Sequence, residues 1–230
     1  MPRITVAFLP ARFRRPPGRL ARAAARLAAA AGCALFCSCI GAESRVRLNG
    51  NGSGVIACEY RVARDLENMG ALDGNERWLP VPVGRADLER SVARIDGLTL
   101  VSYSSREAGA DTVHRAEFSF ANPRALEAFF DSSGRQFKAD MAQKKIILSF
   151  PGSEPRNAEF EKLAREALEG YAFFLALTLP EAPRISWFDQ EGKTAVFPGS
   201  CTVNGSVVEC GIPMADLVFL GAALTMEISW

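Results

Sequence analysis

The sequence is poor in the residues on which most enzymes depend. His114 is the only histidine among 230 residues, and no serine or cysteine stands beside it in a recognisable nucleophile motif. The glycine-rich segment 49–54 is not followed by Gly-Lys-Ser/Thr, which excludes a phosphate-binding P-loop. No cluster of histidines, cysteines and carboxylates has metal-ligand spacing. We therefore expect a protein without enzymatic activity, cofactor or metal.

Acidic residues are missing from the first 39 residues, which carry seven arginines. A hydrophobic run of about 20 residues, which a membrane-spanning helix needs, is also missing. The apolar run 27–38 has twelve residues, a length typical of the hydrophobic part of a secretory signal. A basic segment followed by a short apolar run predicts an export signal over residues 1–39.

The end of this signal predicts a lipid anchor. Phe36-Cys37-Ser38-Cys39 resembles a loose bacterial lipobox, in which a signal peptidase cuts before a cysteine that carries diacylglyceryl and fatty acyl chains such as palmitate. We expect lipidation at Cys39. Cys33, which follows Ala31-Gly32, is the alternative acceptor. A plain cleaved signal or an uncleaved anchor remains a third interpretation.

The charge balance separates the signal from the rest of the chain. The whole chain has 27 basic and 26 acidic residues; without the seven arginines of the signal, 27 − 7 = 20 basic residues face 26 acidic ones, a net charge of −6. An acidic domain is a poor partner for nucleic acid. Residues 40–230 are predicted to be one extracytoplasmic domain, with a sub-boundary near 151–170, on the periplasmic or outer-membrane face of a bacterial cell envelope.

Residue periodicity predicts an α+β fold, with a mostly antiparallel sheet and about three helices packed on it. Predicted strands cover 44–49, 55–62, 98–105, 113–120, 135–140, 144–150, 171–179, 184–188, 192–196 and 224–230. Predicted helices cover 86–95, a short segment opened by Asn122-Pro123, and 160–168, whose apolar face is Phe160, Leu163, Ala164, Ala167 and Leu168; residues 214–220 are a short turn or helix. His114 and Cys58 fall on inward faces of their strands, so we interpret both as structural residues.

Strand 171–179 is apolar on both faces. Tyr171, Phe173, Leu175 and Leu177 share one side, and Ala172, Phe174 and Ala176 share the other. Such a strand is either central and covered on both faces or lines an apolar cavity. In the second case these four residues would contact a hydrophobic ligand.

Residues 201–210 predict a hairpin with a cysteine near each end. An Asn204-Gly205 turn places Cys201 diagonal to Cys210, whereas a Gly205-Ser206 turn places the two cysteines directly opposite each other. In an oxidising compartment we expect a Cys201–Cys210 disulfide and a free Cys58.

The order of these elements, from the lipobox through a turn-rich hairpin to the closing segment Ile212-Pro213-Met214-Ala215-Asp216-Leu217, resembles the LppM-type envelope lipoproteins. The resemblance covers roughly residues 44–230 and implies an extracytoplasmic α+β domain that binds lipid or glycolipid and has no catalytic residues. Two functions therefore follow as hypotheses. One is a lipid-anchored protein that binds a hydrophobic ligand, and the other is a structural or adaptor lipoprotein that presents a surface, such as segment 64–85, to a protein of the envelope.

Overall fold

A computed structural model describes residues 42–64, 67, 84–131, 136–153 and 158–230, which all lie in the second of the chain's two units, Leu35–Trp230. The described strands are β1 (Ala42–Leu48), β2 (Gly54–Ala63), β3 (Leu98–Ala108), β4 (Asp111–Phe120), β5 (Phe137–Asp140), β6 (Lys145–Phe150), β7 (Ala172–Thr178), β8 (Arg184–Phe188), β9 (Ser200–Asn204), β10 (Val207–Pro213) and β11 (Leu224–Ser229). The described helices are α3 (Arg85–Val92), α4 (Pro123–Phe130), α5 (Ala158–Ala167) and α6 (Met214–Val218). The predicted α+β class is confirmed, with one short helix more than the three expected.

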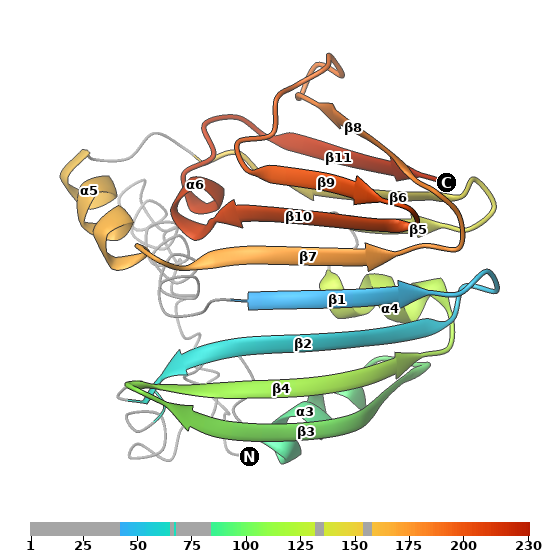
Figure 1. Cartoon of the computed structure of the whole chain (residues 1–230), viewed down its shortest axis with the longest axis horizontal. Coiled ribbons are helices and arrows are strands. Elements are labelled where there is room, and N and C mark those ends of the chain that lie inside the picture. The colour runs from blue at the N-terminus through green and yellow to red at the C-terminus, as the bar shows by residue number, and fades with distance from the viewer. Residues whose placement is uncertain (1–41, 65–66, 68–83, 132–135, 154–157) are drawn as a thin grey trace, which may run out of the picture. The chain divides into compact units, whose positions relative to one another are not determined.

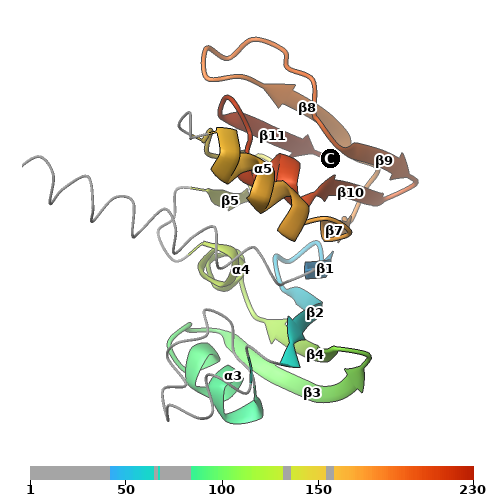
Figure 2. The ribbon, with the colours of Figure 1, turned by 90° about the vertical axis from the view of Figure 1, so that its left-hand side faces the viewer.

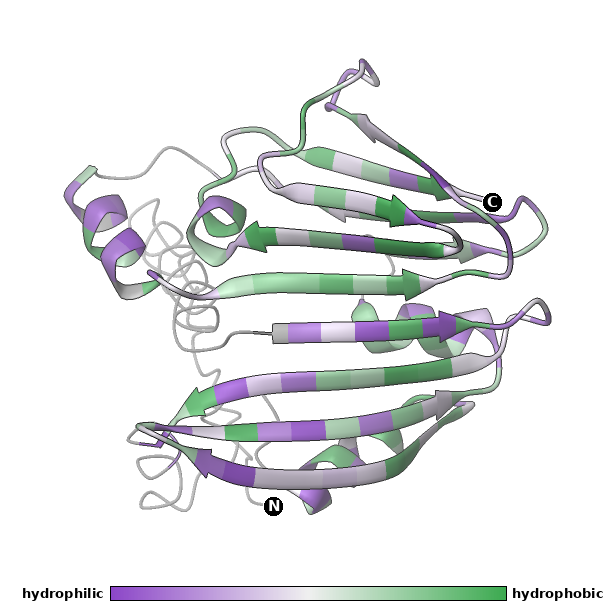
Figure 3. Cartoon of the chain, viewed as in Figure 1, coloured by the Kyte–Doolittle hydropathy of each residue, from purple (hydrophilic) through white to green (hydrophobic). Residues whose placement is uncertain are grey.

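Seven strands form the larger sheet, in the order β3-β4-β2-β1-β7-β10-β9 (Figure 1). Strands β1 and β7 pair in parallel, with Ala42 opposite Phe173, and every other neighbouring pair in this sheet is antiparallel. Strand β7 therefore lies inside the sheet, between β1 and β10. Its inward residues Leu175 and Leu177 are buried, whereas Phe174 on the other face is half-buried, and the strand is largely apolar along its length (Figure 3).

Four strands form the smaller sheet, in the order β5-β6-β11-β8. Both sheets combine strands from before and after residues 151–170. The strand predicted over 192–196 is wrong, because only one isolated bridge, between Thr194 and Phe188, forms there. The Asp189 carboxylate accepts hydrogen bonds from the backbone N–H groups of Glu191 and Lys193 at 2.8 and 2.9 Å, which makes a turn of this segment.

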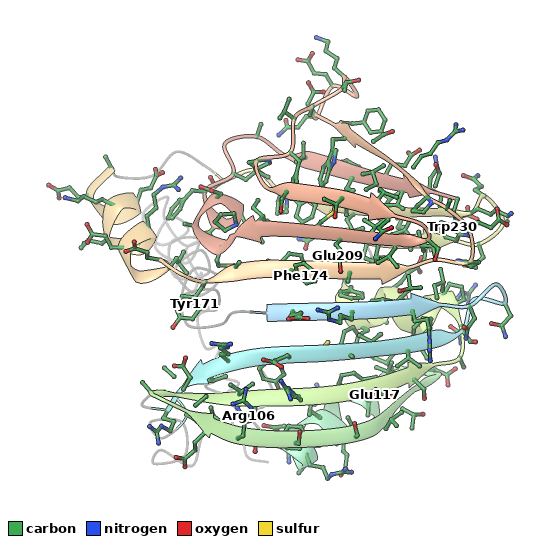
Figure 4. All side chains as sticks on the ribbon, viewed as in Figure 1. Arg106, Glu117, Tyr171, Phe174, Glu209 and Trp230 are labelled. Atoms are coloured by element: carbon green, nitrogen blue, oxygen red, sulfur yellow. A yellow bond between two sulfur atoms is a disulfide. The ribbon has the colours of Figure 1, made fainter. Side chains whose placement is uncertain are left out.

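The two faces of the larger sheet have opposite character. One face carries the apolar residues of each strand and packs against α3 and α4 (Figure 2). The other face, turned toward the viewer in Figure 1, carries charged and small side chains, including Arg106, Glu117 and Glu209 (Figure 4). We call this second side the open face. The alternation predicted for β1, β2 and β4 produces this division.

The core joins the two sheets. A chain of aromatic rings runs from Phe118 on β4 through Phe129 and Phe130 of α4 to Phe137 on β5, with centroid separations of 5.1, 5.2 and 4.9 Å. Helix α4 begins as predicted, because the Asn122 side chain accepts the N–H of Ala125 at 3.0 Å. This ring chain fixes the helix between the sheets.

Helix α5 departs from its predicted packing. Leu168, just after the helix, is buried, but Leu163 is 66% exposed. Leu163 therefore does not belong to a buried face, although its spacing matches one. Periodicity identifies an apolar stripe on a helix without showing how much of that stripe is covered.

Candidate functional site

The predicted acylation sites, Cys39 and Cys33, lie outside the described residues, as does most of segment 64–85. Their roles stay predictions. Among the described residues, no helix is long and apolar enough to cross a membrane. Nor does the described part of the chain contain a group of three or more histidines, cysteines and carboxylates that could hold a metal ion.

The residues predicted to contact a hydrophobic ligand start at the beginning of β7 and face the core. Leu175 and Leu177 are each 1% exposed, and Phe173 and Tyr171 are half-buried. Side chains of the smaller sheet fill the space in front of this face. On β10, which pairs with β7, the Cys210 sulfur lies 3.8 Å from the Met226 sulfur of the smaller sheet. At Leu175 and Leu177 the strand thus contacts packed protein. A ligand at these positions stays a prediction, and this packing does not favour it.

Cys201 and Cys210 face each other across the β9–β10 hairpin, with their sulfurs at disulfide distance. Asn204 pairs with Val207, so the turn residues are Gly205 and Ser206, and Gly205 has a φ of +59°. This is the second of the two turns considered above, the one that aligns the cysteines. In the part of the chain that the structure describes, Cys58 is the free cysteine.

Removing this disulfide by a Cys201→Ser/Cys210→Ser double substitution is expected to lower the free energy of unfolding. The cross-link spans nine residues, and a loop of this size corresponds to about 2–3 kcal/mol of unfolded-state entropy. Chemical denaturation of both proteins measures the loss. Non-reducing peptide mapping of protein purified from the envelope is the control, and free thiols at both positions would contradict the pairing.

His114 forms the centre of a buried polar cluster on the inner face of the larger sheet. Its side chain is fully buried, and its Nδ1 lies 2.9 Å from the Tyr103 hydroxyl. The ring stacks on Tyr60, which pairs with it across β2 and β4, at 5.0 Å and 15°. Tyr103 stacks on the other side at 6.2 Å. The Nε2 atom has no hydrogen-bond partner among the described residues.

The electrostatics of this cluster do not activate a nucleophile. Burial lowers the pKa of His114, with a smaller opposing effect from the Glu67 carboxylate. Burial also raises the pKa of the Cys58 thiol, although the contact with the Ser44 hydroxyl at 3.6 Å lowers it slightly. At neutral pH the imidazole is therefore neutral and the thiol protonated. Placing the inward faces of β2, β4 and β3 side by side would have brought Tyr60 and Tyr103 next to His114.

A shallow groove of about 330 Å³ lies on the open face, across β1, β2, β4 and β3. Its charged side chains form two ion pairs: Arg115 with Glu59 at 2.5 Å, and Arg45 with Glu43 at 2.5 Å. The Arg45 guanidinium also lies over the Phe174 ring, 5.6 Å from its centroid. The lining residues are Glu43, Arg45, Ala57, Cys58, Glu59, Ser102, Ser104, Arg115, Ala116 and Glu117. We call this the open-face groove.

Strand register explains why these residues meet. One row across the sheet is Glu209, Ala176, Arg45, Ala57, Glu117 and Ser102, and the next is Gly211, Phe174, Glu43, Glu59, Arg115 and Ser104. The groove forms where the side chains in these rows are small, and charged side chains border it. Sequence reasoning missed this site because its lining residues, from Glu43 to Glu117, lie up to 74 residues apart, and alternation along one strand does not show which strands will be neighbours.

A second groove, of about 630 Å³, lies between α5 and the start of β7. Arg165 of α5 binds Glu161 at 2.9 Å and Asp216 of α6 at 3.0 Å, and its guanidinium lies 5.1 Å from the Phe219 ring centroid. Tyr171 lines this groove, so one of the four predicted ligand contacts does face a concave surface.

No protein-family model matches the chain, and a search of curated proteins finds no significant match.

Proposed function

We propose that this chain is a lipid-anchored lipoprotein of the bacterial envelope whose non-catalytic domain binds an envelope protein through its open face. The anchor is the acylated Cys39 predicted from the sequence. The resemblance to LppM-type lipoproteins agrees with this location, while the packing favours the adaptor over the lipid-binding hypothesis.

The observation that carries the proposal is the charged face of the larger sheet, which no described helix covers (Figure 1). Arg115 and Arg45 have side chains 57% and 59% exposed, and each has a carboxylate neighbour. Exposed ion pairs add only about 0–1 kcal/mol to stability. Charges arranged across a surface contribute more to the choice and orientation of a partner. The charges of the groove therefore contribute more to the recognition of a partner than to the stability of the fold.

Two other functions receive less support. Binding an acyl chain along β7 would need space beside Leu175 and Leu177, which pack in the core together with Met226. Catalysis at His114 would require a substrate to reach its side chain, which is fully buried. Binding a protein through the open face requires neither an apolar cavity nor an activated catalytic group.

An inverted ion pair tests the proposal. In the Glu59→Arg/Arg115→Glu double variant the pair can still form, so we expect a change in the free energy of unfolding of less than about 1 kcal/mol. A partner that reads the original polarity meets like charges, and we expect crosslinked partner to fall at least about tenfold. Quantitative mass spectrometry of complexes crosslinked in native membranes provides the measurement.

The matched control inverts an exposed pair elsewhere, through Glu191→Lys/Lys193→Glu, in which the two groups lie 2.6 Å apart. This variant should retain the wild-type partner. Equal recovery from both variants, or crosslinking that returns only the monomer from the wild type, would argue against the open face as the binding surface.

A further inference from the structure

The point at which the chain enters the domain is set by the β1–β7 pairing. Because these strands are parallel and Ala42 lies opposite Phe173, β1 and β7 start at the same end of the sheet. Helix α5 ends just before β7, and Tyr171 accepts the N–H of Met214, the first residue of α6, at 2.9 Å. The end of the sheet at which the described chain begins therefore also carries α5 and α6 (Figures 1 and 2).

The tether to the anchor is short. Only Ile40 and Gly41 separate Cys39 from Ala42, and three fully extended residue steps span about 10–11 Å. Helix α5 has ten residues, which corresponds to a length of about 15 Å. A domain held on such a tether keeps this end close to the bilayer.

The surface at this end suits the interface of a membrane. Leu163 of α5 is 66% exposed, and residues 215–220 of α6 and the following turn, which include Leu217, Val218 and Leu220, are half-buried. Both basic residues of α5 are paired, because Arg165 binds Glu161 and Asp216 and Lys162 lies 4.0 Å from Glu166, while Glu159 and Glu169 add two further carboxylates to this end. One exposed leucine beside half-buried apolar residues is compatible with the boundary between headgroups and acyl chains.

We infer that the α5–α6 end of the domain lies against the headgroup layer of the bilayer that holds the chain's own lipid. The inference rests on the anchor at Cys39 in the proposed function. It gives the domain an orientation, in which its strands stand away from the membrane and the open face is presented to the side. The same orientation makes the open face accessible to another protein of that membrane.

Photocrosslinking in the full chain tests this orientation. A photoreactive amino acid replaces Leu163 in one variant and Val203 in another; Val203 is 46% exposed and lies beside the β9–β10 turn, at the opposite end of the strands. After irradiation of native membranes, we expect lipid adducts on the peptide containing position 163 and none above background at position 203. Both side chains are exposed, so neither change should disturb folding.

The mass of the N-terminal peptide is measured in the same samples. Acyl groups on Cys39 with equal labelling at both positions, or with none at 163, would overturn the orientation and leave the anchor intact. A protein adduct at 163 would also overturn it, because the occupant would then be a partner. Lipid adducts at 163 without acylation would support the membrane-facing surface and overturn the anchor, and the absence of both would overturn the two proposals together.

Discussion

Replacing Leu177 by alanine is expected to lower the free energy of unfolding by about 3–4 kcal/mol, because the substitution leaves a cavity in a packed core. Leu177 is 1% exposed and lies between Val46 of β1 and Val208 of β10, which are 2% and 1% exposed. These neighbours belong to paired strands and cannot collapse into the vacated space without shifting the sheet. Chemical denaturation measures the loss.

The matched control is Leu163→Ala, which removes the same atoms from a side chain that is 66% exposed. Its effect should stay within about 0.5 kcal/mol. The pair of variants also separates the two interpretations of β7. If Leu177 lined a ligand cavity, its truncation would cost less than about 1 kcal/mol and would change the uptake of a fluorescent fatty acid.

Local patterns predicted most of the individual strands and hairpins. Alternation predicts Ile56, Cys58, Tyr60 and Val62 on one face of β2; Cys58 is half-buried and the other three are buried. The sequence predicted the Cys201–Cys210 hairpin and left two possible turns. The strand register shows that the turn residues are Gly205 and Ser206. These features depend on neighbouring residues, whose influence on backbone geometry can be read directly from the sequence.

The long-range pairings could not be predicted in the same way. Strand β7 pairs with β1 in parallel although about 130 residues separate them, and β11 joins β6 and β8 in the other sheet. An apolar run does not specify which strand will pair with it in the sheet. The two interpretations of β7 stayed open for this reason, and the open-face groove, which depends on the same sheet order, was not predicted.

Lowering the pH is expected to destabilise the protein through His114. Burial lowers the pKa of His114 from its ordinary value of 6.5, so the unfolded chain takes up a proton more readily than the folded one. The stability contribution of the neutral imidazole is therefore complete above about pH 7. It is lost as the pH falls through 6.5 toward the folded-state pKa, by up to about 1.4 kcal/mol per pH unit.

The geometry explains why the folded protein resists this proton. The imidazolium carries an N–H on both nitrogens, and no described residue accepts a hydrogen bond from Nε2 of this ring, which stacks on Tyr60 and Tyr103. Other groups that act on the cluster are the Cys58 thiol and the Asp87 and Glu67 carboxylates, of which Glu67 opposes the shift at His114. Protonation therefore favours unfolded states in which the imidazole reaches water.

His114→Phe isolates this contribution from the carboxylates that also titrate in acid. Phenylalanine keeps an aromatic ring between the tyrosines but gives up the contact with the Tyr103 hydroxyl, so a modest and pH-independent loss of stability is expected. The stability advantage of the wild type over the variant, measured by urea denaturation from pH 7.5 to pH 5, should decrease as the pH falls through 6.5. Parallel curves for the two proteins would show that His114 reaches water in the folded state, contrary to its complete burial in the stack.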